Sequence, residues 1–314
     1  MKARIFHTAT LVAVFAGTLP AVDQNLLNLV MPDAKVVAGV NVLSAESSPF
    51  GQYVLSQFAG NANFAVAIAQ LGFDPTKDLN EVLTASNGVK GSPSGLAMAT
   101  GTFNVSAITT AAVTGNAVTE TYNGVTLIED PQHNGAVAFL TSTLVVAGDL
   151  ASVKAAIDRQ SAPQALPASL VSQIKTLSAS EDAWFISAVP VSSLLGPNAG
   201  VVAPGLGANA KTQLNIAGQI QSANGGVKFG ANVAFTAQVQ ADNAQDATNL
   251  AGMLQLVANM AQLQASTNPQ AAALAKALMV SSSGTAVNVS LTLPAAQFQQ
   301  LLKPQAAMKH PVRK

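Results

Sequence analysis

A histidine and an aspartate lie close together in the sequence, and they are the first residues to consider for chemistry. The chain has three histidines, of which only His133 lies away from the two chain ends. Asp130 precedes it by three positions, so a carboxylate could orient the imidazole as a general base. A hydrolase that uses Asp130 and His133 is therefore one hypothesis. The surrounding proline, asparagine and glycine instead favour a solvated turn between two strands.

Other patterns that would indicate catalysis or a cofactor are weak or missing. Cysteine is absent, which excludes disulfides, thiolate metal sites and cysteine nucleophiles. Gly205 and Gly207 match a loose dinucleotide-binding pattern, but no clear strand precedes them and no acidic residue follows at the right distance. Asp74, Asp78 and Glu81 would share a helix face, where the helix dipole explains the carboxylates at the start without calcium. We expect no metal and no cofactor, and the sequence favours a protein without enzymatic activity.

Three large side chains are candidates for contacts with a bound ligand. Trp184 is the only tryptophan, and an indole can stack on a ligand or pack within a sheet. Met253 and Met260 lie in a helical pattern rich in Ala and Leu, where flexible thioethers can line an apolar cavity or fill a core. A carrier of an apolar ligand is the hypothesis that these residues suggest, and core packing is the ordinary explanation.

The elements that would position these residues fall into two related halves. Residues 33–42 and 182–191 share the pattern D-A-x, then two apolar residues, two small residues and V-x-V. Each copy predicts a buried strand that leads toward a serine-containing helix start. Residues 143–153 and 287–298 also share one pattern, a strand that runs directly into a helix. We predict an α+β fold of two related halves, each a mostly antiparallel sheet with helices packed on one face.

Local signals refine this organisation. A capping Asp74 followed by Pro75 predicts a helix that extends to residue 83. Asn123-Gly124 predicts a tight hairpin turn, and residues 224–226 predict a second turn between strands. The strongest helical periodicity covers residues 243–264. The predicted domains are a signal peptide over 1–22, a first half over 23–160, a linker over 161–169, a second half over 170–303 and a flexible basic tail over 304–314.

Composition and the first residues predict an exported protein. Charged residues make up 10% of the chain and the formal net charge is zero, so no nucleic-acid partner is indicated. Lys2 and Arg4 precede an apolar run that ends at Leu19, which is the layout of a secretory signal. We expect a periplasmic or extracellular protein, with an uncleaved N-terminal anchor as the alternative. No later segment reaches the length of a membrane-spanning helix.

Three motifs together give a family resemblance. They are a P-D-A segment before an early strand (Pro32, Asp33, Ala34), a G-x-D-P-x-x-D-L stretch (Gly72, Asp74, Pro75, Asp78, Leu79) and a G-D pair between a late strand and a helix (Gly148, Asp149). This order resembles uncharacterised exported bacterial proteins of the acidobacterial and planctomycete type. The resemblance covers most of the chain after the signal and implies a two-half α+β body. It brings no known activity, and it therefore adds no functional residue.

The sequence thus favours an exported, non-enzymatic protein that acts by binding or as a component of the cell envelope. Its partner is not specified, and an envelope protein or an apolar ligand is compatible with the pattern.

Overall fold

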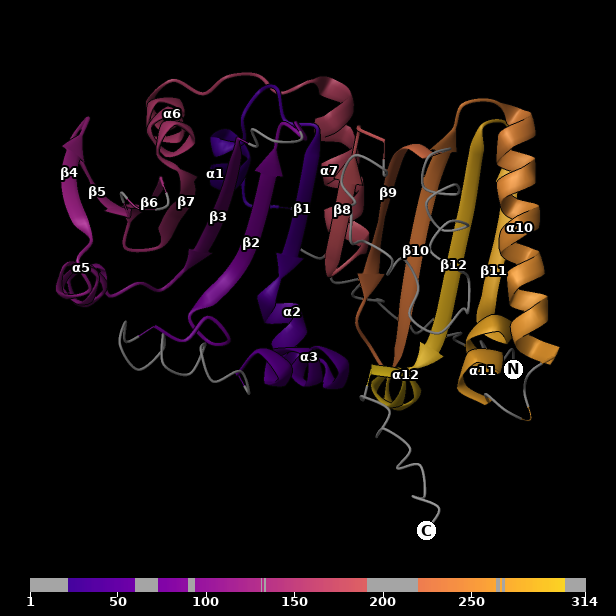
Figure 1. The fold of residues 1–314 in the computed structure, drawn as a ribbon. Helices are drawn as coiled ribbons and strands as arrows, with labels where there is room; N and C mark the ends of the chain where they lie inside the picture. Colours follow the sequence, from indigo (N-terminus) through magenta and orange to yellow (C-terminus); the bar gives the residue numbers. More distant parts are fainter. Residues whose placement is uncertain are drawn as a thin grey trace, which may run out of the picture.

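The computed structural model describes residues 22–59, 73–89, 94–130, 132, 134–190, 220–263, 266 and 269–302. These residues form a mixed α+β structure around one antiparallel sheet of 12 strands (Figure 1). The predicted α+β fold class is confirmed. The predicted signal peptide, apart from Val22, and the predicted basic tail lie outside the described residues.

The strands are β1 (Val36–Asn41), β2 (Leu79–Ser86), β3 (Gly95–Gly101), β4 (Val118–Tyr122), β5 (Val125–Asp130), β6 (Gly135–Thr141), β7 (Leu144–Asp149), β8 (Ala183–Ser187), β9 (Ile220–Lys228), β10 (Asn232–Ala241), β11 (Leu278–Ser283) and β12 (Ala286–Pro294). The helices are α1 (Gln24–Leu29), α2 (Val42–Ser47), α3 (Pro49–Ala59), α5 (Val105–Thr114), α6 (Leu150–Ser161), α7 (Ala168–Ser180), α10 (Ala244–Leu263), α11 (Pro269–Ala277) and α12 (Ala295–Leu302).

The two repeated sequence segments meet in the middle of this sheet. β1 and β8 pair antiparallel, with Val37 opposite Ile186. Outward from this pair, the strand order is β1-β2-β3-β7-β6-β5-β4 on one side and β8-β9-β10-β12-β11 on the other. The order β1-β2-β3-β7-β6 therefore has a counterpart in β8-β9-β10-β12-β11. The β4 and β5 hairpin is an addition to the first side, and its Asn123-Gly124 turn has positive φ values of 48° and 80°, as a tight hairpin requires.

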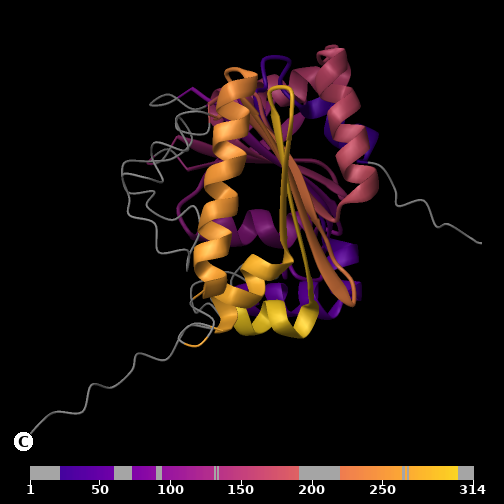
Figure 2. The ribbon, with the colours of Figure 1, turned by 90° about the vertical axis from the view of Figure 1, so that its right-hand side faces the viewer.

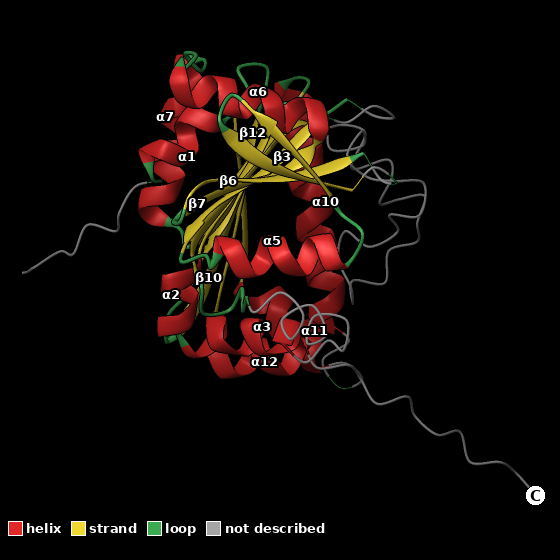
Figure 3. Ribbon diagram, turned by 90° about the vertical axis from the view of Figure 1, so that its left-hand side faces the viewer, coloured by secondary structure: helices red, strands yellow, loops and turns green. Residues whose placement is uncertain are grey.

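One face of the sheet is covered by α1 and α6 over the first side and by α7 over β8 and β9 (Figure 3). Alternate residues of the strands point into this layer, including Leu83 of β2 and Met98 of β3, and both are fully buried. α1 contributes Leu26 and Leu29, and α6 contributes Val153. Fully burying a side chain of this size stabilises the fold by about 1.5–3 kcal/mol. The largest core cluster therefore lies between these three helices and the sheet.

The opposite face carries other helices. α5 packs beside β3 through a cluster that contains Phe103, and α10 packs on the β10–β12 region through Leu250. Figure 2 shows α10 and α7 on opposite faces of the sheet. At one end of the strands, Phe50 of α3 lies 5.2 Å from Phe298 of α12 and 5.8 Å from Phe229, measured between ring centroids.

Two local predictions were wrong. The helix expected to extend to residue 83 is a short turn at residues 75–77 followed by β2, because the alternation of Leu83 and Ala85 toward the core fits a strand between β1 and β3. The turn expected at residues 224–226 lies inside β9. Gly226 is needed there for close approach, since a Cβ atom would lie 2.5 Å from the Glu181 side chain. The chain turns instead between Lys228 and Asn232.

Candidate ligand-binding site

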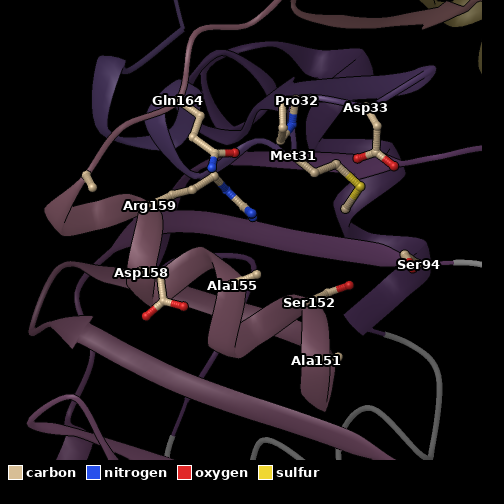
Figure 4. A pocket seen from close by; sticks show the side chains of 11 residues that line it. Met31, Pro32, Asp33, Ser94, Ala151, Ser152, Ala155, Asp158, Arg159 and Gln164 are labelled. Atoms are coloured by element: carbon tan, nitrogen blue, oxygen red, sulfur yellow. The ribbon is translucent and has the colours of Figure 1, made fainter.

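A cavity of about 480 Å³ lies between α6 and the segment that joins α1 to β1 (Figure 4). Its walls come from three parts of the chain that the fold brings together: the α1–β1 connection, the start of β3, and α6 with the residues after it. The lining residues are Met31, Pro32, Asp33, Ser94, Ala151, Ser152, Ala155, Asp158, Arg159, Ala162 and Gln164. Small side chains on α6, such as Ala151 and Ala155, leave the space open.

The position of α6 is fixed at its first turn. Asp149 at the end of β7 is the N-cap and accepts a hydrogen bond from the Ser152 backbone N–H at 2.9 Å. Its other carboxylate oxygen accepts from the Gly95 N–H at 3.2 Å. Burial would raise the pKa of Asp149, but hydrogen bonds from Ser152 and Gly95 outweigh it and lower the pKa. A charged cap stabilises a helix start, and here it also joins α6 to β3.

The side chain of Arg159 lies at the floor of the cavity. Arg159 is in the last turn of α6 and is only 6% exposed. Its Nε and Nη2 atoms donate to the Leu29 carbonyl oxygen at 3.1 and 2.9 Å. Leu29 is the last residue of α1, so this carbonyl is one that a helix leaves without an internal partner. The cation at a helix C-terminus is also favoured by the helix dipole.

The guanidinium keeps donors that no described residue uses. Arginine has five N–H donors, and the Leu29 carbonyl is its hydrogen-bond partner within the described parts of the chain. No carboxylate there forms an ion pair with it. Burial lowers the pKa of Arg159, while the charges of Asp33 and Asp158 act in the opposite direction. Figure 4 shows the guanidinium between α6 and the segment with Met31 and Pro32.

Two carboxylates lie at the exposed rim. Asp158 accepts hydrogen bonds from the Tyr122 hydroxyl at 3.1 Å and from Asn123 Nδ2 at 2.8 Å. Asp33 is exposed where it lines the cavity. The cavity therefore has a positive group at its floor and negative groups at its rim. The described residues that line it include no histidine, cysteine or lysine, so they are better suited to hold a charged molecule than to transfer a proton.

The residues that the sequence suggested lie elsewhere. His133 is outside the described residues. Asp130 ends β5 and accepts a hydrogen bond from the Gln132 N–H at 3.0 Å, so the hydrolase hypothesis stays a prediction from the sequence. Met253 of α10 is partly buried and packs against the core cluster that this helix covers. Met260 of the same helix is 53% exposed. Asp130, Met253 and Met260 do not line the Arg159 cavity.

Trp184 is part of the core. It is 5% exposed and lies opposite Gly39 across the β1–β8 pair. A Cβ atom at Gly39 would be 2.5 Å from the indole ring, so the ring occupies the space that glycine leaves. Packing accounts for Trp184 without a ligand.

The helical spacing around Arg159 is a sequence signal that could have predicted this buried residue. Ser152, Ala156 and Arg159 have the i, i+4, i+7 spacing of one helix face, and all three are buried. A charged residue on the inward face of a helix is rarely buried without a specific partner. Asp33 and Asp158 gave no such signal, because only the fold brings them to the same cavity.

Two further features are absent from the described residues. No group of three or more His, Cys, Asp or Glu side chains there could hold a metal ion. No helix in the described ranges is long and apolar enough to cross a membrane.

Comparison with known proteins places the fold but gives no family. No protein-family model matches the chain, and no curated protein matches its sequence. Three crystal forms of the protein TP0453 have a similar structure. Form III has a TM-score of 0.55 at 12% identity, over 87% of this chain and 96% of that chain. Form I has a TM-score of 0.50 at 11% identity, over 88% and 95%, and form IV has 0.51 at 10%, over 88% and 96%. The likeness shows a shared fold over most of the chain.

Proposed function

We propose that this chain is an exported, non-catalytic binding protein that holds a small molecule with both a carboxylate and an amine. The observation that carries the proposal is the buried Arg159 beside a cavity of about 480 Å³. Cavities of about 300–1,000 Å³ are typical for small ligands. In this arrangement the ligand carboxylate meets the guanidinium, and the ligand amine lies near Asp33 and Asp158.

The carboxylate assignment follows from the cost of a buried cation. Removing a charged group from water costs several kcal/mol, which is offset when a partner of opposite charge satisfies its hydrogen bonds. The Leu29 carbonyl meets only part of this need, because it is neutral and uses two of the guanidinium nitrogens. A planar carboxylate matches the donor fork of arginine, and hydrogen bonds to charged groups contribute about 1.5–3 kcal/mol each.

The ligand amine is assigned from the two carboxylates at the rim of the cavity. Asp33 and Asp158 would repel a simple anion that approaches Arg159, and they would attract an ammonium group. A molecule with both charges satisfies the floor and the rim together. Amino acids and short peptides have this chemistry at their ends.

The export part of the proposal is supported by the first residues of the sequence. The basic Lys2 and Arg4, followed by the apolar run to Leu19, support passage through a secretory route. Cell fractionation tests this part of the proposal. Protein recovered in the periplasm or medium is expected, and full-length protein confined to the cytoplasm would contradict it.

Binding is tested with a probe and two capped forms of it. The probe is the dipeptide alanyl-alanine, and one capped form carries a C-terminal amide and the other an N-terminal acetyl group. Calorimetric titration should show binding of the free dipeptide, a loss of about tenfold or more with the amide, and a smaller loss with the acetyl form.

Two variants locate the binding. Ala155→Phe fills the cavity and leaves the Arg159–Leu29 contact in place, so it should abolish binding without unfolding the protein. Asp33→Asn should weaken binding of the free dipeptide but leave binding of the N-acetyl form unchanged. No binding by the wild type, or equal binding by Ala155→Phe, would refute the proposal.

A further inference from the structure

We infer that cleavage between Ala21 and Val22 leaves an α-ammonium group on Val22, which Ser178 and the carboxylates of Asp23 and Glu81 hold inside the folded protein. In this step an external signal peptidase hydrolyses the peptide bond with one water molecule, leaving a carboxylate on Ala21 and the amine on Val22. The inference rests on the export part of the proposed function. This cut lies one residue before the end of the signal peptide predicted over 1–22. Ala21 fits the small residue that such enzymes prefer directly before the cut, and Leu19 departs from the small residue preferred at the third position before it.

The first described residues are tied to two distant elements. Val22 is 7% exposed, and its backbone nitrogen donates to the Ser178 hydroxyl of α7 at 3.3 Å. The next backbone nitrogen, that of Asp23, donates to Glu81 Oε2 of β2 at 3.1 Å. The Asp23 side chain caps α1 by accepting from the Asn25 N–H at 2.7 Å. The backbone at the expected new terminus is therefore held between α7 and β2.

This place has two carboxylates and no described cation beside them. No Lys, Arg or His of the described chain forms an ion pair with Glu81 or Asp23. Burial raises the pKa of Glu81, the hydrogen bond from the Asp23 backbone lowers it, and the Asp23 charge raises it. The residues opposite Glu81 are neutral, Asn41 on β1 and Thr100 on β3. An ammonium group one residue from Asp23 would supply the missing positive charge.

The other charged groups on the surrounding elements do not fill this role. On α7 the charged residue is Lys175, which is exposed and forms no ion pair with a described residue. At the start of α1 the charged residue is Asp23 itself, which is one of the two carboxylates. The free amine of Val22 has three N–H donors where the peptide had one, so it can keep the Ser178 bond and also face the carboxylates.

The consequence is a pH dependence with a defined sign. An α-amino group titrates at about 7.7–8.0 when unperturbed. Burial at Val22 lowers the pKa of this group and the carboxylates of Asp23 and Glu81 raise it, and we expect the two carboxylates to outweigh the burial. A raised pKa contributes stability that is fully present below the unfolded value and is lost as the pH rises through the folded value. The mature protein should therefore lose stability above a pH of about 8.

The first experiment is mass spectrometry and N-terminal sequencing of the exported protein, with Val22 as the expected first residue. The second is thermal unfolding of that product between a pH of about 6.5 and 10. Its midpoint should fall by about 2–4 °C over this range, and both the Glu81→Gln variant and protein acetylated on Val22 should lose most of this fall. Glu46→Gln, a carboxylate change on α2, is the matched control and should keep it.

The outcomes separate this inference from export itself. An uncleaved product retained in the cytoplasm would contradict both. An exported product that begins at another residue would contradict the cleavage site. A product that begins at Val22 and whose pH dependence is the same in wild type, Glu81→Gln and acetylated protein would contradict the ion pairing alone.

Discussion

The two sides of the sheet have corresponding strand orders but differ in what covers them. Around β3, β6 and β7, helices α1 and α6 cover one face, and the Arg159 cavity lies between α6 and the segment that joins α1 to β1, whereas α7 covers only β8 and β9 of the other side. The register places Thr236, Gln238, Asn288 and Ser290 of β10 and β12 on the same face of the other side. These polar residues line an open groove there, with Leu177 of α7 at its margin.

The difference shows which part of the molecule makes the candidate site. An antiparallel sheet can present one face to water when that face carries polar side chains, as the β10–β12 region does. A cavity requires a second layer, and in this chain α1 and α6 provide it. The sheet is therefore a scaffold common to both sides, and α1 and α6 form the cavity on the first side.

The same contrast holds for the two aspartates of the repeated segments. Asp33 is exposed at the cavity rim. Asp182 is 2% exposed, lies 2.8 Å from Lys228 Nζ, and accepts from the Phe229 N–H at 2.6 Å. One position can thus serve binding while its counterpart stabilises a hairpin.

The largest effect is expected at the contact between the two sides. Trp184→Ala removes the ring that packs over Gly39 and should lower the free energy of unfolding by about 3–5 kcal/mol. Denaturant unfolding followed by circular dichroism measures it, with Trp184→Phe as a milder control. A loss below about 1 kcal/mol would mean that this contact does not hold the two sides together.

The second prediction compares the two aspartates directly. Asp182→Asn weakens two charge-assisted contacts of a buried group and should cost about 1.5–3 kcal/mol, with Lys228 contributing little because it is partly exposed. Asp33→Asn should change stability by less than about 0.5 kcal/mol. The same unfolding measurement tests both variants, and equal losses would contradict the different roles assigned to them.

The smallest effect concerns the open face. Burial raises the pKa of Glu181, which accepts a hydrogen bond from the Thr236 hydroxyl at 3.0 Å. A carboxyl group with a raised folded pKa contributes stability at low pH that is lost as the pH rises through that value. Glu181→Gln keeps an acceptor for Thr236 and should therefore be slightly more stable than wild type at neutral pH. The difference should shrink below the ordinary glutamate pKa of about 4.3, and a constant difference at every pH would contradict the burial argument.

Much of the architecture could be predicted from the sequence, because alternation and caps are local. The strands at residues 36–41 and 183–187 and the long helix at 244–263 follow from their patterns. The strand β2 could not be distinguished from a helix, since Asp74 and Pro75 have the local chemistry of a helix start and only pairing with β1 and β3 decides the outcome. β11 carries a weak alternating pattern and depends on its pairing with β12.

The candidate site was less predictable than the fold. Arg159, Asp33 and Asp158 come from two distant segments, and nothing in their local sequence brings them to one cavity. The residues that attracted attention were those with distinctive chemistry, such as Trp184 and Met253, and packing accounts for both.

The most direct test of the central claim is to follow the Arg159 Nε–H signal by NMR while alanyl-alanine is added. This proton is buried and bonded to the Leu29 carbonyl, so it should give a resolved signal in the free protein. We expect a saturable shift of this signal with the free dipeptide and none with its C-terminal amide. A signal that stays in place up to about 20 mM dipeptide, a concentration above even a millimolar Kd, would contradict the assignment of this cavity as the binding site.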